Sequence, residues 1–567
     1  MKKLLLSILF LLLSSQAWAA VPVIFYSDLT SGPNTGGVNN KGVYVTIWGK
    51  NFGATQGGSS VSVNGLVDNY PTWSDTMICF QLGSGVSTGN ITVTTSAGTS
   101  NGIPFTVRSG NIYFIDPNAV SNGTGTLASP FQHIHGFYIV SVAGDTAYIR
   151  AGTITNEYNC HTGVHSICAP DSGHSGTAAN PIALVQYPNE TTTISATQST
   201  STWPDGTDTI QYDFRDWGGD YWIFSKFTAS STSTSVNGAG DVFTAGSDWR
   251  VVGNSINYRN EPYNAISVSQ NNVEILGNTI HDSYVDSYNN TTHDIYVNAP
   301  ASNFEIGWNS MLRNHNVGWS VSVYHNGPKS GLIHDNIIAP TNAGDEKGIE
   351  VDAGAYDSGD DITTTYGDVI KVYNNILNNA GIANLGGAIQ QVCGTSYIYN
   401  NTFYGSGTET KGLAQMLDST CGPGGGSPKY YFADNILYGN NAGLYIAGTT
   451  GGGTPVWGDF QVLSSNNYFG EGNGPTQDVS PINADPKFTT NFTDFHLQAG
   501  SPDIAAGYNT NSIVITDYDG LTRGNPPSIG AYEGAGSPPP PPPPPPVTTG
   551  TGEILKGSLK VTGVNFQ

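Results

Sequence analysis

The feature that most constrains the fold is a six-residue unit, apolar-x-x-Asn-x-apolar, that recurs through the middle of the chain. The asparagines of this unit are Asn254, Asn278, Asn309, Asn336, Asn375, Asn401, Asn435 and Asn467. The shortest spacing, Asn254 to Asn278, is 24 residues, and the longest, Asn336 to Asn375, is 39 residues. A period that varies over this range is typical of stacked coils that carry loops of different length.

One such coil cannot bury its apolar positions alone, so like residues must stack on like residues in neighbouring coils. The asparagines would then lie at one turn and share amide hydrogen bonds along the stack. The Leu-x-x-Leu-x-Leu frame of a leucine-rich repeat is absent from the sequence. We therefore expect an all-β chain whose body is a right-handed parallel β-helix, a solenoid of single coils.

Residues 21–108 alternate apolar and polar positions in short runs separated by Gly and Asn, a pattern typical of a small antiparallel β-sandwich. The stretch Thr46-Ile47-Trp48-Gly49-Lys50-Asn51-Phe52-Gly53 resembles the G-x-N-F-G core of IPT/TIG immunoglobulin-like domains. This resemblance implies a spacer or binding module and no chemistry.

Residues 111–535 resemble the pectate-lyase-like β-helix proteins of the bacterial secreted class. The resemblance lies in Tyr113-Phe114-Ile115-Asp116-Pro117, Ser129–Ile134 and Gly144–Thr153 at the start, and in Asp494–Leu497 and Ile529–Glu533 at the end. It implies the fold family. It does not fix an activity, because one fold carries many functions.

The two ends of the chain predict export and attachment. Residues 1–19 combine a basic start, an apolar run and Ala17-Trp18-Ala19, which is typical of a cleaved secretory signal peptide. Residues 536–549 form a proline-rich linker, and residues 550–567 are a short tail of unknown role. We therefore expect a secreted, extracellular or cell-surface bacterial protein with no membrane insertion, and a monomer.

Export also favours disulfides, and the cysteine spacing suggests Cys160 with Cys168 and Cys393 with Cys421. Cys79 is then left over and is expected to be a buried, small apolar residue.

The chain of 567 residues has 72 glycines, 11% charged residues and a net charge of −23. Turn-rich, weakly charged composition suits many short strands. The negative charge disfavours nucleic acid and anionic membranes as partners. It also means that a polyanionic substrate would need a bridging cation.

Five segments that precede asparagine units align as strands of one sheet, and period-2 alternation sends their Ile and Val side chains inward. The outward positions are Asp294, Tyr296 and Asn298, then Tyr324 with Ser320 and Ser322, then Glu350 and Asp352, then Gln390. Asp294 and Glu350 would lie about 9.6 Å apart across two coils, and Glu350 and Asp352 about 6.6 Å apart along one strand. Both separations lie near the range for inverting glycoside hydrolysis. The plainer alternative is that these carboxylates only keep the sheet soluble.

The neighbouring basic side chains suggest a second chemistry, β-elimination. His325 or Lys329 could abstract a proton next to a uronate carboxylate, and His293 could help to hold substrate. Asp352, Asp357, Asp360 and Asp361 form an oxygen-rich loop that could hold Ca²⁺, although the spacing is not that of an EF-hand. An exposed acidic loop without an ion explains the same residues.

Two hypotheses of function follow from the sequence. In the first, the protein is a polysaccharide lyase or inverting glycoside hydrolase that cleaves glycosidic bonds in a groove on the parallel sheet. In the second, it is a non-catalytic adhesin or glycan-binding protein, which the sandwich, the proline spacer and the tail also suit. The partner is a polysaccharide or cell-surface glycan in both cases.

Overall fold

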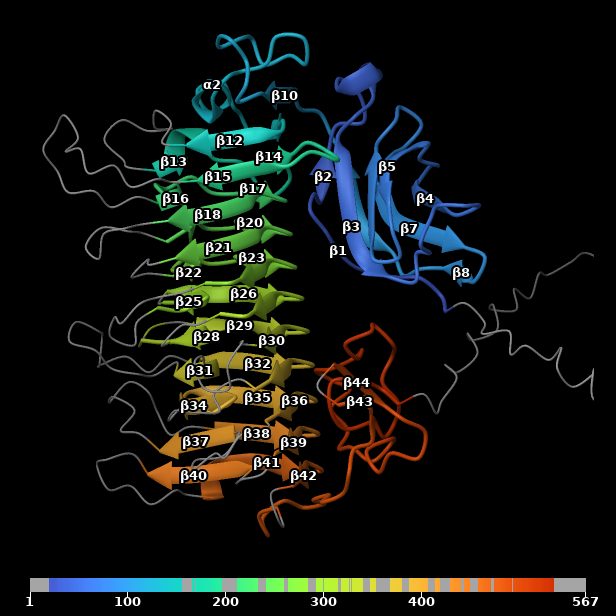
Figure 1. Cartoon of the computed structure of the whole chain (residues 1–567), viewed down its shortest axis with the longest axis vertical. Coiled ribbons are helices and arrows are strands. Elements are labelled where there is room, and N and C mark those ends of the chain that lie inside the picture. The colour runs from blue at the N-terminus through green and yellow to red at the C-terminus, as the bar shows by residue number, and fades with distance from the viewer. Residues whose placement is uncertain are drawn as a thin grey trace, which may run out of the picture.

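The computed structural model describes residues 20–155, 166–168, 170–195, 212–232, 241–259, 264–283, 292–298, 300–314, 318–325, 327, 329–339, 347–352, 368–379, 387–405, 414–418, 429–439, 443–448, 457–470, 474–491 and 493–534. Over these residues the body of the protein is a right-handed parallel β-helix, as the asparagine repeat predicts (Figure 1). Three parallel sheets of 12, 11 and 10 strands run along its length, and every coil between the first and the last contributes one strand to each sheet in turn.

The 12-stranded sheet contains β10 (Ile112–Ile115), β11 (Thr146–Ile149), β14 (Ile182–Gln186), β17 (Trp222–Ser225), β20 (Arg250–Val252), β23 (Glu274–Leu276), β26 (Ala301–Gly307), β29 (Lys329–His334), β32 (Val369–Tyr373), β35 (Thr395–Tyr399), β38 (Lys429–Ala433) and β41 (Phe460–Ser464). The 11-stranded sheet contains β12 (Gly152–Thr155), β15 (Thr192–Ser195), β18 (Thr228–Thr232), β21 (Ser255–Arg259), β24 (Thr279–His281), β27 (Ser310–Leu312), β30 (Ile337–Ala339), β33 (Ile376–Asn378), β36 (Thr402–Tyr404), β39 (Ile436–Tyr438) and β42 (Asn467–Phe469). The 10-stranded sheet contains β13 (Ser166–Cys168), β16 (Tyr212–Arg215), β19 (Phe243–Ala245), β22 (Ile266–Val268), β25 (Ile295–Val297), β28 (Trp319–Val323), β31 (Lys347–Asp352), β34 (Ile389–Cys393), β37 (Ala414–Asp418) and β40 (Leu444–Gly448). A short helix, α2 (Ile134–Tyr138), lies at the first coil, and η2 (Ser172–His174) and η3 (Trp457–Asp459) are single 3-10 turns.

The asparagine ladder lies at the tight turn between the 12-stranded and 11-stranded sheets. Asn309 donates from Nδ2 to Asn336 Oδ1 over 3.0 Å, and Asn336 donates in the same way to Asn375 over 2.9 Å. The residue before each ladder asparagine has a positive φ, for example Gly277 at 62° and Asp335 at 53°. Short polar residues and glycine tolerate this conformation best, which explains why Gly, Asp and Asn dominate the position.

The assignment of Asn467 to the predicted ladder is wrong. The ladder ends on Asn466, whose Oδ1 accepts from Asn435 Nδ2 over 3.1 Å. Asn467 instead donates to Asp503 Oδ1 over 2.8 Å, because the last unit of the repeat is shifted by one residue. The sequence motif was weakest at this point, and consecutive asparagines there made the register ambiguous.

Before the β-helix, two sheets form the N-terminal sandwich. One has the order β1 (Val23–Ser27), β3 (Tyr44–Lys50), β6 (Met77–Gln81) and β5 (Asn69–Trp73). The other has the order β2 (Ser31–Gly32), β9 (Ile103–Val107), β7 (Gly89–Thr95) and β4 (Ser60–Val63), with β8 (Gly98–Thr99) beside β7, and η1 (Val38–Asn40) lies between β2 and β3. All strand pairs of the two sheets are antiparallel except β2 with β9. This arrangement agrees with the predicted small sandwich, while the IPT/TIG relationship stays a prediction.

The sandwich packs on the outer face of the 12-stranded sheet, along its first rungs (Figure 1). Tyr148 of β11 accepts from the Tyr44 backbone amide over 2.7 Å, and the Lys226 ammonium lies 3.0 Å from the buried carboxylate of Asp28. A Cβ at Gly277 would collide with the Tyr26 hydroxyl, so a glycine at this turn is what lets the sandwich approach the coil this closely. Sandwich and β-helix therefore share a continuous buried interface.

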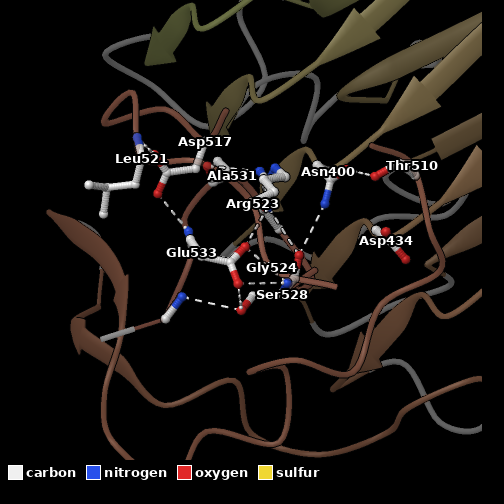
Figure 2. Close-up of polar contacts among 12 residues, drawn as sticks. Asn400, Asp434, Thr510, Asp517, Leu521, Arg523, Gly524, Ser528, Ala531 and Glu533 are labelled. Atoms are coloured by element: carbon white, nitrogen blue, oxygen red, sulfur yellow. Dashed lines mark hydrogen bonds and ion pairs between the residues drawn. The ribbon is translucent and has the colours of Figure 1, made fainter. Parts of the chain in front are cut away.

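After β42 the chain turns back and forms a C-terminal lobe, residues 474–491 and 493–534 (Figure 1). The lobe packs on the outer side of the 11-stranded sheet at Ile376, Tyr404 and Ile436 and of the 12-stranded sheet at Tyr399 and Ala433. Its regular structure is the antiparallel pair β43 (Phe488–Thr490) and β44 (Asp494–Leu497). Arg523 anchors the lobe, because its guanidinium donates to Asn374 Oδ1 over 2.7 Å and to the Gly530 carbonyl over 2.9 Å. Figure 2 shows Arg523 beside Ser528 and Glu533 of the same lobe. The predicted β-helix range of 111–535 thus contains the stacked coils and this lobe.

Several predictions fall outside the described residues. The signal peptide, the proline linker and the tail lie there, as do Cys160 and Cys421, and the side chain of Cys393 is not described. Both disulfides therefore stay predictions, while Cys79 and Cys168 are buried in the two main cores. Within the described residues no helix is long and apolar enough to cross a membrane.

Candidate functional site

A single row of outward-facing residues crosses the middle of the 10-stranded sheet. Tyr296 of β25 pairs in register with Ser322 of β28, which pairs with Glu350 of β31, which pairs with Gln390 of β34. The alternate residues on these strands, such as Ile295, are buried in the core. The predicted alignment of these four residues is therefore confirmed, although their roles stay predictions.

Glu350 is the carboxyl group at the centre of this row, and it is 8% exposed. Its Oε2 accepts from Ser322 Oγ over 2.6 Å, and Gln390 Nε2 lies 3.5 Å from its Oε1. Burial raises the pKa of Glu350 to about 7, against the opposing effects of the Ser322 hydrogen bond, the Lys347 charge and a hydrogen bond from the Trp319 side chain. The group is therefore a carboxylic acid that keeps its proton close to neutral pH.

Trp319 and Lys347 lie side by side at the start of β28 and β31. They are partners in register, and the Lys347 ammonium lies 5.2 Å from the centre of the Trp319 ring. Burial lowers the pKa of Lys347, while the nearby Glu350 opposes that shift. Both residues act directly on Glu350, Lys347 through its charge and Trp319 through a side-chain hydrogen bond.

His293, Tyr296, Tyr324 and His325 form an aromatic cluster beside the row. The His293 ring stacks on Tyr296 at 5.1 Å between centroids and 9° between planes, and His325 meets Tyr296 edge-on at 6.2 Å. His325 also meets Tyr324 at 4.9 Å. The structure thus brings together four residues that the sequence proposed separately for substrate binding or catalysis.

His293 is a hydrogen-bond acceptor in this cluster. Its Nδ1 accepts from the Trp319 backbone amide over 2.9 Å, which places the ring proton on Nε2. Burial lowers the pKa of His293 to about 3, so the ring is neutral wherever the protein is folded near neutral pH.

Asp294 does not face outward, and the predicted Asp294–Glu350 pair is wrong. Its side chain has no exposed surface and accepts from Asn314 Nδ2 over 2.8 Å and from the Tyr258 hydroxyl over 3.1 Å. Asp294 precedes β25, so the alternation rule for strands does not apply to it. The turn directs the carboxyl toward the edge of the core, where Tyr258 lies.

Lys329 is placed differently from the prediction as well. It opens β29 in the 12-stranded sheet, is 2% exposed, and donates from Nζ to the His325 carbonyl oxygen. Its backbone amide donates to Asp368 Oδ1 over 2.7 Å. With this burial the amine supports the position of His325 and does not present itself to a substrate.

The remaining predicted residues are only partly described. Asn298 is half-buried and follows β25, where its amide donates to the Val268 carbonyl over 2.7 Å. Asp352 lies in β31 opposite Cys393, but its side chain is not described, and Asp357, Asp360 and Asp361 lie outside the described residues. Among the residues that are described, no group of three His, Cys, Asp or Glu side chains could hold a metal ion. The Ca²⁺ site therefore stays a prediction.

Sequence reasoning missed how Ser322, Trp319 and Lys347 surround Glu350. Ser322 was recognisable as an outward residue, but its hydrogen bond depends on the register of β28 against β31. Trp319 and Lys347 lie where each strand begins, and no periodic pattern marks that position. Only the pairing of the two strands makes them neighbours.

No protein-family model and no curated protein sequence matches this chain. Among solved structures it is similar to pectate lyase Pel9A, with 14% identity, 75% of this chain and 96% of that chain covered, and a TM-score of 0.44. It is also similar to XylC in complex with xylose, with 10% identity, coverage of 74% and 98%, and a TM-score of 0.42. A family 28 exopolygalacturonase from Yersinia enterocolitica matches with 10% identity, coverage of 79% and 91%, and a TM-score of 0.28.

Proposed function

We propose that the protein is an exported carbohydrate-active enzyme that cleaves glycosidic bonds of a polysaccharide at Glu350. The observation that carries this proposal is a nearly buried carboxyl group, with its pKa raised by burial to about 7, on one row with Tyr296 and Gln390. A general acid works best when its pKa lies near the working pH.

In this reaction Glu350 donates its proton to the leaving glycosidic oxygen as the bond to the sugar carbon breaks. In hydrolysis, a water molecule supplies the hydroxyl group to that carbon, and a second group accepts the water proton. In β-elimination, a base removes a ring proton instead, and a carbon–carbon double bond forms. Tyr296 and Tyr324 offer ring faces and hydroxyls against which a sugar can stack and bond.

The test is a screen of the purified protein against acidic and neutral polysaccharides. Elimination gives products that absorb in the ultraviolet, while hydrolysis gives new reducing ends alone. E350Q keeps the shape of the side chain and removes the proton donor, so it should lose the activity. Glu274→Gln, on the outer face of the 12-stranded sheet, is the matched control and should keep it. Binding without cleavage of any polysaccharide would instead favour the adhesin hypothesis.

A further inference from the structure

The outward row that contains Glu350 continues toward the N-terminal end of the β-helix. Tyr296 pairs with Ser267 of β22, Ser267 pairs with Thr244 of β19, and Thr244 pairs with Arg215 of β16. Arg215 is therefore five rungs from Glu350 on the same line of the same sheet, or about 24 Å at ~4.8 Å per rung. Figure 1 shows these strands, β16 to β31, one above another along one side of the molecule.

Arg215 and Trp217 form a paired aromatic and cationic feature at that point. The guanidinium carbon of Arg215 lies 5.2 Å from the centre of the Trp217 ring. Trp217 is 46% exposed, more than any other tryptophan of the described residues, while Trp222 and Trp249 are fully buried. An exposed indole beside a guanidinium offers both a stacking surface and hydrogen-bond donors to a ligand.

The turn that carries Trp217 is fixed by several hydrogen bonds. The Trp217 amide donates to the Pro170 carbonyl over 2.9 Å, and Gly219 donates to the same oxygen over 3.1 Å. Asp216 Oδ1 accepts from the Gly218 amide over 2.7 Å. The ring is thus displayed on a preorganised turn, which lowers the entropic cost of binding.

Between this pair and Tyr296 the row has only small side chains. Thr244 Oγ1 lies 3.2 Å from Asp241 Oδ2, and Ser267 Oγ accepts from Asn264 Nδ2 over 3.0 Å. These bonds hold both hydroxyl groups close to the sheet. Large aromatic side chains therefore lie at the two ends of this stretch, Trp217 beside Arg215 and Tyr296 on the row, and only Thr244 and Ser267 lie between them.

We propose that Arg215 and Trp217 form a distal subsite that binds a sugar residue of the same polysaccharide chain that is cleaved at Glu350. This inference rests on the proposed function. The indole would stack on the C–H face of a sugar ring, and the guanidinium would donate to its hydroxyl or carboxylate oxygens. The substrate is then a polymer that lies along the axis of the β-helix and spans several sugar residues.

Binding by affinity electrophoresis tests the subsite, with polygalacturonate, alginate and xylan as probes and E350Q as the parent so that nothing is degraded. Trp217→Ala and Arg215→Ala should each weaken retention by about tenfold, the effect of losing one stacking or charge-assisted contact. Trp457→Ala and Arg313→Ala change an exposed tryptophan and an exposed arginine elsewhere on the protein and should leave retention unchanged. A larger loss for Arg215→Ala on the two acidic polymers than on xylan would identify a carboxylate ligand, and an equal loss would identify hydroxyls.

Chain length separates this inference from the proposed function. On the polymer that the wild-type protein cleaves, Trp217→Ala should lower kcat/KM for an octasaccharide and leave a trisaccharide unaffected. Equal retention of the Trp217→Ala variant and its parent would overturn the subsite even if cleavage at Glu350 stands. Trp217-dependent retention without any cleavage would instead keep the subsite and overturn the enzyme. If no probe is retained, the subsite is wrong.

Discussion

Ser322 Oγ donates to Glu350 Oε2 over 2.6 Å, between residues that are partners in register on neighbouring rungs. The bond favours the ionised form of the carboxyl group and so opposes the upward shift that burial causes. Glu350 therefore has a pKa near neutral because burial raises it while the Ser322 bond, the Lys347 charge and the Trp319 side chain together lower it.

Ser322→Ala should raise the pKa of Glu350 further, because it removes a hydrogen bond that lowers it. The expected result is a shift of the alkaline limb of the pH–rate profile to higher pH. The protonated carboxyl band in infrared difference spectra against E350Q should persist to higher pH as well. Ser267→Ala, on the same row beside Tyr296, is the control and should leave both unchanged. A downward shift in Ser322→Ala would contradict this account of the carboxyl group.

Asn336→Ala should destabilise the β-helix by about 2–5 kcal/mol, because it leaves several buried polar groups without partners. Asn336 accepts from the Asn309 amide over 2.9 Å and donates to Asn375 Oδ1 over 2.9 Å and to the Ile306 carbonyl over 2.9 Å. Thermal unfolding followed by circular dichroism measures the effect. Asn118→Ala removes an exposed bond to the Ala151 carbonyl and should change stability by less than about 0.5 kcal/mol. Equal effects of the two changes would argue against a stabilising ladder.

Arg523→Met should release the C-terminal lobe from the β-helix. Arg523 is fully buried and donates to Asn374, Ser528, Gly530 and Ala531, so its loss leaves these acceptors and the nearby Glu533 carboxylate without a cation (Figure 2). Removing one partner of a buried ion pair of this kind costs about 3–5 kcal/mol. Limited proteolysis should cut the variant between the last coil and the lobe. Lys487→Met, in the same lobe with an exposed bond to the Gly500 carbonyl, should resist proteolysis like the wild-type protein.

His334 should make stability depend on pH above neutrality. Burial alone would lower its pKa, but hydrogen bonds and charges from Asp335 and Glu305 outweigh burial and raise the pKa to about 9. A raised pKa in the folded state stabilises the protein fully below the unfolded value, and this contribution is lost as pH rises through about 9.

The midpoint of thermal unfolding of the wild-type protein should therefore fall between about pH 7 and about pH 9, by an amount equivalent to about 1–3 kcal/mol. His334→Gln should show a lower midpoint at pH 7 and a flatter dependence. His281→Gln is the control and should keep the wild-type slope. An unchanged slope in His334→Gln would show that other groups cause the dependence.

The asparagine repeat predicts the β-helix, because the same six-residue motif recurs from coil to coil and so aligns the coils on one another, whatever the length of the loops between them. Period-2 alternation also placed Tyr296, Ser322, Glu350 and Gln390 on one row, since all four lie inside strands. It failed at Asp294, which lies in a turn where alternation has no meaning. The pKa of Glu350 could not be predicted, because it depends on burial and on contacts with Trp319 and Lys347 that arise only when β28 and β31 pair.

The position of the C-terminal lobe could not be predicted for a similar reason. Arg523 is far in sequence from Asn374, and nothing local to either residue indicates that they meet. In the sequence, Asn374 is simply the residue that precedes the ladder residue Asn375, a position whose identity varies from coil to coil. Its role as an acceptor for the lobe follows from the folding back of the chain.

The most direct test of the account is the pH dependence of kcat/KM for the wild-type protein and E350Q on the polysaccharide that the screen identifies. We expect a wild-type rate that declines as pH rises through about 7 and a loss of about 10²–10⁴-fold in E350Q below that pH. An E350Q variant that keeps the wild-type rate and the same pH profile would contradict the assignment of Glu350 as the proton donor.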